Sequence, residues 1–136
     1  MFSFELFAQK EDANLKELFL DAEFFFLNEE YEDALSNYQM IYKRGYDDNG
    51  NINYRIGQCF LNIPGEKSKA IPYLEQAVQL ANAKYQEGVF KEKNAPFDAY
   101  YYLGNAYRIN NQFEKAKASY EQFKTFFKTT DKERLS

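Results

Sequence analysis

The sequence predicts an all-α fold in which three helical hairpins stack into an α-α superhelix. Apolar residues recur at spacings of three and four, which is the period of a helix that buries one face. Strand-type alternation is absent, and a motif of two small residues twelve or thirteen positions apart occurs three times. Aromatic residues make up 19% of the chain, and large rings opposite small residues suit closely packed helices.

The clearest hairpin lies in residues 100–120. Gly104 and Ala116 stand twelve residues apart, and such small side chains let two helix axes approach closely. Each small residue lies in an apolar stripe with helical spacing. The stripes contain Tyr100, Leu103 and Tyr107 in the first helix, and Phe113, Tyr120 and Phe123 in the second. The pattern predicts an antiparallel helix pair.

Two earlier copies extend this pattern over nearly the whole chain. Gly57 and Ala70 are the small residues of the second copy, and Ala22 and Ala34 are those of the first. We therefore expect a single domain, residues 1–136, whose repeats cover about 12–44, 51–84 and 97–129. The wider gap before the third copy indicates an insertion at about 85–96.

Turn and capping residues divide these repeats into six helices. We expect the first two helices at 12–27 and 31–43, followed by a turn at 45–51 that is rich in Gly, Asp and Asn. The third helix covers 52–61, and Ser68 caps the fourth, which extends by one or two turns into the insertion. Pro96 opens the fifth helix, and the sixth runs from 113 towards 129.

The first nine residues, M-F-S-F-E-L-F-A-Q, have two interpretations. They form a helix that packs on the first hairpin, or they are the remnant of a secretory signal. The second interpretation lacks the basic region that signals carry, and Glu5 interrupts its apolar run.

Composition argues against catalysis, cofactors, nucleic acid and membrane spans. The chain has no His, which removes the commonest general base and metal ligand, and it has no Gly-rich phosphate loop. Asp47, Asn49 and Asn51 alternate as in a calcium loop, but the turn glycine and the closing Glu are missing. The net charge is −4 without a basic stripe, and no apolar run reaches the length of a membrane span. We expect the single Cys59 to be a buried structural residue.

The small and large residues of the third hairpin support a family resemblance. Leu103, Gly104, Tyr107, Ala116 and Tyr120 resemble the signature of the tetratricopeptide repeat. The resemblance implies a solenoid whose first helices line a concave groove, and a protein-binding scaffold without enzymatic activity. Its partner is a protein or peptide.

Helical phase selects the residues that face such a groove. They lie one or three positions away from the packing stripes, and aromatic, amide and Arg side chains suit peptide recognition. The candidates are Phe19, Glu23 and Phe26 in the first hairpin, Tyr54, Gln58 and Leu61 in the second, and Tyr101, Asn105 and Arg108 in the third. The alternative is that several of them are half-buried packing residues.

Two further apolar groups need a partner surface. Tyr85, Val89 and Phe90 in the insertion either pack beneath their own loop or form a ridge beside the groove. Phe123, Phe126 and Phe127 lie on the last helix, which no further helix covers. We expect this end to dock on another domain or on a second copy of the chain.

A second resemblance concerns location. Residues 64–78 and 90–107 are similar to the N-terminal repeat region of Bacteroidetes envelope proteins that also carry a WD40-like β-propeller and an OmpA-like domain. The resemblance implies a periplasmic or outer-membrane-associated module of a cell-envelope assembly; the alternative is a cytoplasmic protein.

Two functions other than a protein-binding scaffold stay open. One is a spacer or dimerisation module without a groove ligand, and the other is a sensor of a small apolar ligand.

Overall fold

The computed structural model describes the backbone of residues 2–135 and the side chains of residues 4–127. These residues form six α-helices and no strand beyond one isolated bridge, so the predicted all-α helical-repeat superhelix is confirmed. The helices are α1 (Phe2–Leu27), α2 (Tyr31–Ile41), α3 (Gly50–Leu61), α4 (Ala70–Val78), α5 (Asp98–Ile109) and α6 (Phe113–Leu135).

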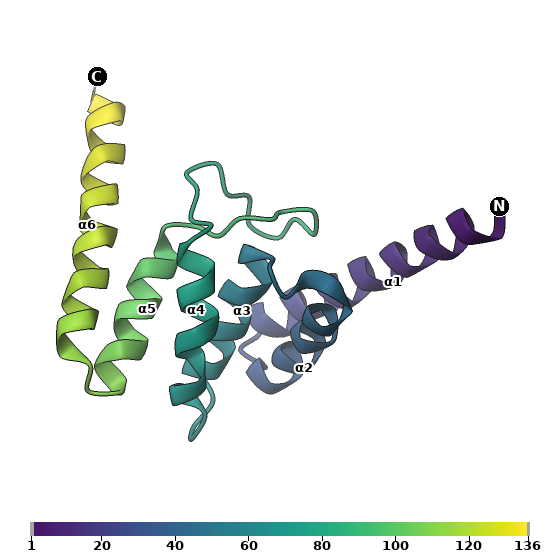
Figure 1. Ribbon diagram of the computed structural model, residues 1–136, viewed down its shortest axis with the longest axis horizontal. Coiled ribbons are helices and arrows are strands. Elements are labelled where there is room, and N and C mark those ends of the chain that lie inside the picture. Colours follow the sequence, from purple (N-terminus) through teal and green to yellow (C-terminus); the bar gives the residue numbers. More distant parts are fainter. Residues whose placement is uncertain (1, 136) are drawn as a thin grey trace.

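Consecutive helices pair into three hairpins that stack side by side (Figure 1). Helix α1 packs on α2, α3 packs on α4, and α5 packs on α6. The contacts of α2 with α3 and of α4 with α5 join the hairpins. Short turns between paired helices and this neighbour-to-neighbour packing are typical of a helical repeat.

Small residues set the distance between the paired helices, as the sequence indicates. A methyl group added at Gly57 would lie 2.5 Å from Cγ of Leu74, which is fully buried in α4. A methyl group at Gly104 would lie 2.5 Å from the ring of Tyr120 in α6. Both glycines therefore sit at positions where any side chain would collide with the partner helix.

The ends of α3 and α4 differ from the sequence prediction. Asn49 caps α3 by accepting a hydrogen bond from the Ile52 amide at 2.9 Å, so the helix begins before residue 52. Ser68 lies within a short 3₁₀ turn and makes no capping hydrogen bond to α4. The expected extension of α4 is wrong, because the Leu80 carbonyl accepts from the Ala95 amide at 2.9 Å instead of continuing the helix.

Helix α1 is longer than predicted and starts ahead of residue 12. Its first turns project away from the other helices (Figure 1), and the Phe4 and Phe7 side chains are 80% and 64% exposed. Residues 2–9 are therefore helical, as one interpretation of the first nine residues expects, but Phe4 and Phe7 do not pack on the first hairpin. Helix α1 packs on α2 only from about Leu15 onward, where the side chains of α1 become buried.

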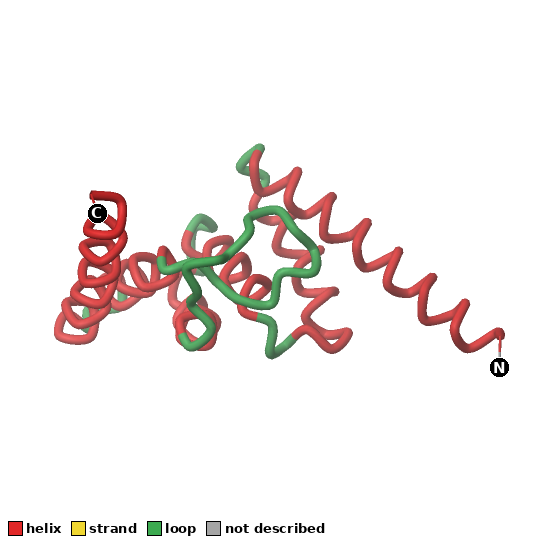
Figure 2. The backbone as a smooth tube through the Cα atoms, turned by 90° about the horizontal axis from the view of Figure 1, so that it is seen from above, coloured by secondary structure: helices red, strands yellow, loops and turns green. Residues whose placement is uncertain are grey.

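The inserted segment is the main departure from a plain stack of hairpins. Residues 79–97, which we call the crossing loop, have almost no regular secondary structure. Figure 2 shows this loop passing over the middle of the helical stack towards α1. The loop thus covers the side of the molecule where the sequence places the binding groove.

Candidate functional site

The crossing loop is pinned together at its base. The Asn82 amide donates to the Ala95 carbonyl at 2.8 Å, and the Ala95 amide donates to the Leu80 carbonyl at 2.9 Å. These bonds form the isolated bridge between Ala81 and Ala95. The loop is therefore a compact excursion whose two ends meet between α4 and α5.

Phe90 fixes the loop tip against the first hairpin. Its ring centroid lies 5.7 Å from that of Phe19 in α1 and 5.6 Å from that of Tyr46, which follows α2. Phe19 is completely buried between Phe90 and Tyr38. Aromatic contacts of this kind bury a large apolar area, so they help to hold the loop against the first hairpin.

Tyr85 fixes the loop against the second hairpin. Its ring packs edge-on against Tyr54 at 6.2 Å, and its hydroxyl donates to Oδ1 of Asn51 at 2.7 Å. Burial raises the pKa of Tyr85 above its ordinary value. Of the two interpretations of the insertion, packing beneath the loop is confirmed for Tyr85 and Phe90, whereas Val89 remains 39% exposed.

Arg55 of α3 is the centre of the polar contacts in this region. Its guanidinium donates to both oxygens of Glu23 in α1, at 2.9 and 3.0 Å, and to Oε1 of Gln58 at 3.1 Å. It also reaches Oε1 of Glu87 in the crossing loop at 3.0 Å. Planar guanidinium suits such forked recognition of carboxylates.

Two neighbouring aromatic side chains complete the Arg55 site. The guanidinium lies 4.1 Å from the ring centroid of Phe26, within the range of a cation–π contact. The Tyr38 hydroxyl donates to Glu23 at 2.6 Å. Burial alone lowers the pKa of Arg55, but the hydrogen bonds and charge of Glu23 outweigh it and raise that pKa. Burial and the adjacent Glu23 charge raise the pKa of Tyr38.

The predicted groove residues of the first two hairpins are thus mostly internal. Glu23, Phe26 and Gln58 are brought together by Arg55, a residue that the sequence analysis missed. Phe19, Glu23, Tyr54 and Gln58 are buried, and Phe26 and Leu61 are half-buried. The prediction that these side chains are open to a partner is wrong for Phe19, Glu23, Tyr54 and Gln58, because the crossing loop or Arg55 contacts each of them. The sequence feature that could have identified Arg55 is its position in α3, between the predicted groove residues Tyr54 and Gln58.

The third hairpin keeps its predicted residues accessible. Tyr101 is 44% exposed, and its ring lies beside Tyr120 and Phe123 of α6. Asn105 is half-buried and accepts a hydrogen bond from the Tyr120 hydroxyl at 2.6 Å. Arg108 is exposed one turn further along α5.

The last helix continues this accessible area with further aromatic rings. Phe127 is 59% exposed and contacts Phe123, while Phe126 stacks on Phe97 at the start of α5. We call Tyr101, Asn105, Arg108, Phe123 and Phe127 the third-hairpin face. It combines exposed aromatic surface with an amide and a guanidinium on two adjacent helices.

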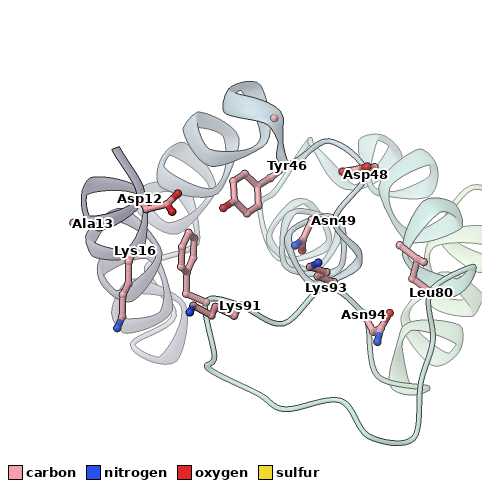
Figure 3. Close-up of a pocket in the computed structure, with 12 residues that line it drawn as sticks. Asp12, Ala13, Lys16, Tyr46, Asp48, Asn49, Leu80, Lys91, Lys93 and Asn94 are labelled. Atoms are coloured by element: carbon pink, nitrogen blue, oxygen red, sulfur yellow. The ribbon is translucent and has the colours of Figure 1, made fainter. Parts of the chain in front are cut away.

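A pocket of about 960 Å³ opens between α1, the segment after α2 and the crossing loop (Figure 3). Asp12 and Lys16 line it from α1, and Lys91 and Lys93 line it from the loop. Burial, together with the charge of Asp12, raises the pKa of Tyr46 in its wall. Ala13, Leu80 and Phe90 also line the pocket, so its wall combines apolar surface with charges of both signs.

Cys59 is completely buried, as predicted, and burial raises the pKa of its thiol to about 12.

No described helix has the length and apolar character needed to cross a membrane. Nowhere among the described side chains do three or more Asp, Glu, Cys or His residues gather as potential metal ligands.

Comparison with known proteins concerns the third hairpin. A family model of the tetratricopeptide repeat matches residues 97–125, which include α5 and the first half of α6. No curated protein matches the chain. The match supports a tetratricopeptide repeat at the hairpin where the small-residue motif is clearest. Such repeats generally mediate contacts between proteins, and their domains are typically non-catalytic.

Proposed function

We propose that this chain is a non-catalytic scaffold that binds a protein partner through its third-hairpin face. The observation that carries the proposal is the difference between the three predicted groups of binding residues. The groups of the first two hairpins are largely buried, whereas Tyr101 and Arg108 remain accessible on the third. The third hairpin also contains the match to a repeat that generally mediates protein contacts.

The chemistry of the third-hairpin face suits a protein surface or peptide. Tyr101 and Phe127 supply exposed ring area, and Arg108 supplies a guanidinium that can pair with a carboxylate or a main-chain carbonyl. Tyrosine and arginine are the residue types that contribute most to protein interfaces. The adjacent end of α6, with Phe123, Phe126 and Phe127, docks on a further domain or on a second copy of the chain.

The proposed setting is a bacterial cell-envelope assembly, in the periplasm or at the outer membrane. Its support is the resemblance of residues 64–78 and 90–107 to envelope proteins with the same type of repeat region. Fractionation of cells that express the tagged protein with its natural gene context tests this location. Recovery in the cytoplasmic fraction alone would contradict it.

A second candidate function is a spacer without a groove ligand, and one observation favours it. Phe19 and Tyr54 are buried rather than open, which favours a structural role for the first two hairpins. This candidate predicts that substitutions on the third-hairpin face leave every interaction unchanged.

The experiment that separates the two candidates compares two double variants of the tagged protein in affinity capture from source cells. Tyr101→Ser with Arg108→Ser removes one exposed aromatic and one exposed Arg from the third-hairpin face. Phe24→Ser with Arg44→Ser removes the same residue types from exposed positions on the first hairpin. We expect the first variant to lose at least about tenfold in partner recovery, and the second to match the unchanged protein. Equal recovery by both variants would favour the spacer.

A further inference from the structure

The crossing loop contacts the same residues that helical phase assigns to the concave groove. Phe90 packs on Phe19, and Tyr85 packs on Tyr54. Glu87 pairs with Arg55, which in turn holds Glu23 and Gln58. The loop therefore occupies the position that a bound peptide would take between α1 and α3.

The three loop contacts come from one short run of residues. Tyr85, Glu87 and Phe90 lie within six positions and belong to no helix or strand. Each side chain contacts a different place on the helices. Tyr85 contacts Tyr54 and Asn51, Glu87 pairs with Arg55, and Phe90 packs on Phe19 and Tyr46. An irregular segment with three nearby side chains that contact separate places on the helices resembles a recognised peptide rather than a core element.

The base of the loop would stay joined if the rest of the loop left this position. Its two ends are joined by the hydrogen bonds between Leu80, Asn82 and Ala95, so α4 and α5 stay connected when the tip moves. The tip itself is open to solvent, with the Glu87 side chain 69% exposed and Gly88 at a positive φ of 77°. Glu23 alone would still satisfy two guanidinium nitrogens of Arg55.

Asn51 shows that the loop fits its position incompletely. Asn51 is 1% exposed, and its Oδ1 accepts from Tyr85, but its Nδ2 has no hydrogen-bond partner among the described residues. Buried amide donors are nearly always paired. A main-chain carbonyl of a peptide seated here would supply the missing acceptor.

We propose that the cleft between α1 and α3 is a peptide site that the crossing loop fills as an internal ligand. Its external ligand is a turn-forming peptide of a partner protein with the pattern Tyr-x-Glu/Asp-x-x-Phe, because residues 86–92 of the loop fold back through the bond from the Gln86 amide to the Glu92 carboxylate. The aromatic residues enter the Tyr54 and Phe19 subsites, and the carboxylate pairs with Arg55. This site is separate from the third-hairpin face, so one partner can be held by the face while its peptide displaces the loop.

Tethering gives the loop a large advantage over any free peptide. A segment joined at both ends competes at an effective concentration in the millimolar range. The unchanged protein should consequently bind a free copy of the loop weakly, and weakening the loop in place should uncover the site.

The test uses the full chain and a fluorescein-labelled peptide of residues 84–92, which contains Tyr85, Glu87 and Phe90 but lacks Lys93. The loop-release variant carries Tyr85→Ser, Glu87→Ser and Phe90→Ser. The matched control carries Lys84→Ser, Val89→Ser and Lys91→Ser, which changes exposed residues of the same loop. Fluorescence anisotropy should show the release variant binding the peptide at least about tenfold more tightly than the control or the unchanged protein. A peptide with the same three serine replacements should bind none of them.

Hydrogen exchange on the unchanged protein provides a second measurement that needs no folded variant. Excess peptide should accelerate exchange of the Gly50 amide, which donates to the Lys93 carbonyl in the loop, while the serine peptide should not. Tyr101→Ser with Arg108→Ser should leave both results unchanged, which separates this site from the third-hairpin face. Equal binding of the two peptides by the release variant, or unchanged exchange at Gly50, would overturn the proposal. The proposal would also be overturned if the unchanged protein formed a dimer that the release variant could not form. That result would indicate that the loop of one copy fills the cleft of another.

Discussion

Arg55 connects three parts of the chain that are far apart in the sequence. It contacts Glu23 in α1, Gln58 in its own helix and Glu87 in the crossing loop. Its side chain is 2% exposed and Glu23 is 10% exposed, while Glu87 is largely in solvent. The Arg55–Glu23 pair is therefore the buried ionic contact, and the Glu87 contact is screened by water.

At the residue scale we predict that Arg55→Ala lowers the free energy of unfolding by about 3–5 kcal/mol. The substitution leaves the Glu23 carboxylate buried without its cation, and that penalty exceeds the value of the pair itself. Urea denaturation followed by circular dichroism measures the change. Glu87→Gln is the control on the exposed side of the same Arg and should cost less than about 1 kcal/mol. A smaller loss for Arg55→Ala than for Glu87→Gln would contradict the assignment of Glu23 as the buried partner.

At the element scale, the helix pairs depend on close approach at glycine. Gly57 in α3 faces Leu74 in α4, and Gly104 in α5 faces Tyr120 in α6. Leu74 is fully buried, so it has little room to move away from an added methyl group. The ring of Tyr120 is half-buried and has more freedom, although its hydroxyl is bonded to Asn105.

Gly57→Ala should lower the free energy of unfolding even though alanine is the better helix former. The gain in helix propensity is about 1 kcal/mol, whereas overpacking a filled core costs about 1–3 kcal/mol. Thermal and urea denaturation of Gly57→Ala, Leu74→Ala and the double variant measure the coupling between the two positions. The double variant should lose less stability than the sum of the single variants. Strict additivity would show that the two side chains do not compete for the same space.

At the scale of the whole molecule, the core depends on groups that must remain protonated. Burial raises the pKa of the Cys59 thiol from 9.0 to about 12. Burial, followed by the hydrogen bond to Glu75, raises the pKa of Tyr107 from 10.0 to about 12. Burial likewise raises the pKa of Tyr54 above its ordinary value. Deprotonation of each group is easier in the unfolded chain than in the fold.

The fold should therefore lose stability at alkaline pH. A raised pKa contributes stability that is fully present below the unfolded value, near pH 9 for the thiol, and is lost as the pH rises towards about 12. For Cys59 the loss is on the order of 2–4 kcal/mol at the upper end. Urea denaturation at pH 7, 9, 10 and 11 measures it. Cys59→Ala should show a shallower decline, and a slope unchanged by this substitution would contradict the role of the thiol.

Much of the helical architecture could be predicted from single residues. The spacing of Gly104 and Ala116 identified the third hairpin, and a spacing one residue longer, between Gly57 and Ala70, identified the second. The start of α3 was missed although Asn49 caps it locally through the Ile52 amide, whereas the end of α4 was missed because the Leu80 carbonyl pairs with the distant Ala95 amide. The site was predicted as a surface but is largely filled, and only Tyr101 and Arg108 keep the expected exposure.

The amino-acid sequence was enough to define the three hairpins and the stripe of each helix that packs on its neighbour. These follow from local periodicity and from small residues at fixed spacing, which act within one or two adjacent helices. The contacts of the crossing loop with α1 and α3, and the link that Arg55 makes between Glu87 and Glu23, became visible only in the folded chain. Such contacts link residues 32 positions apart. Their energy depends on packing and burial, which no local pattern in the sequence encodes.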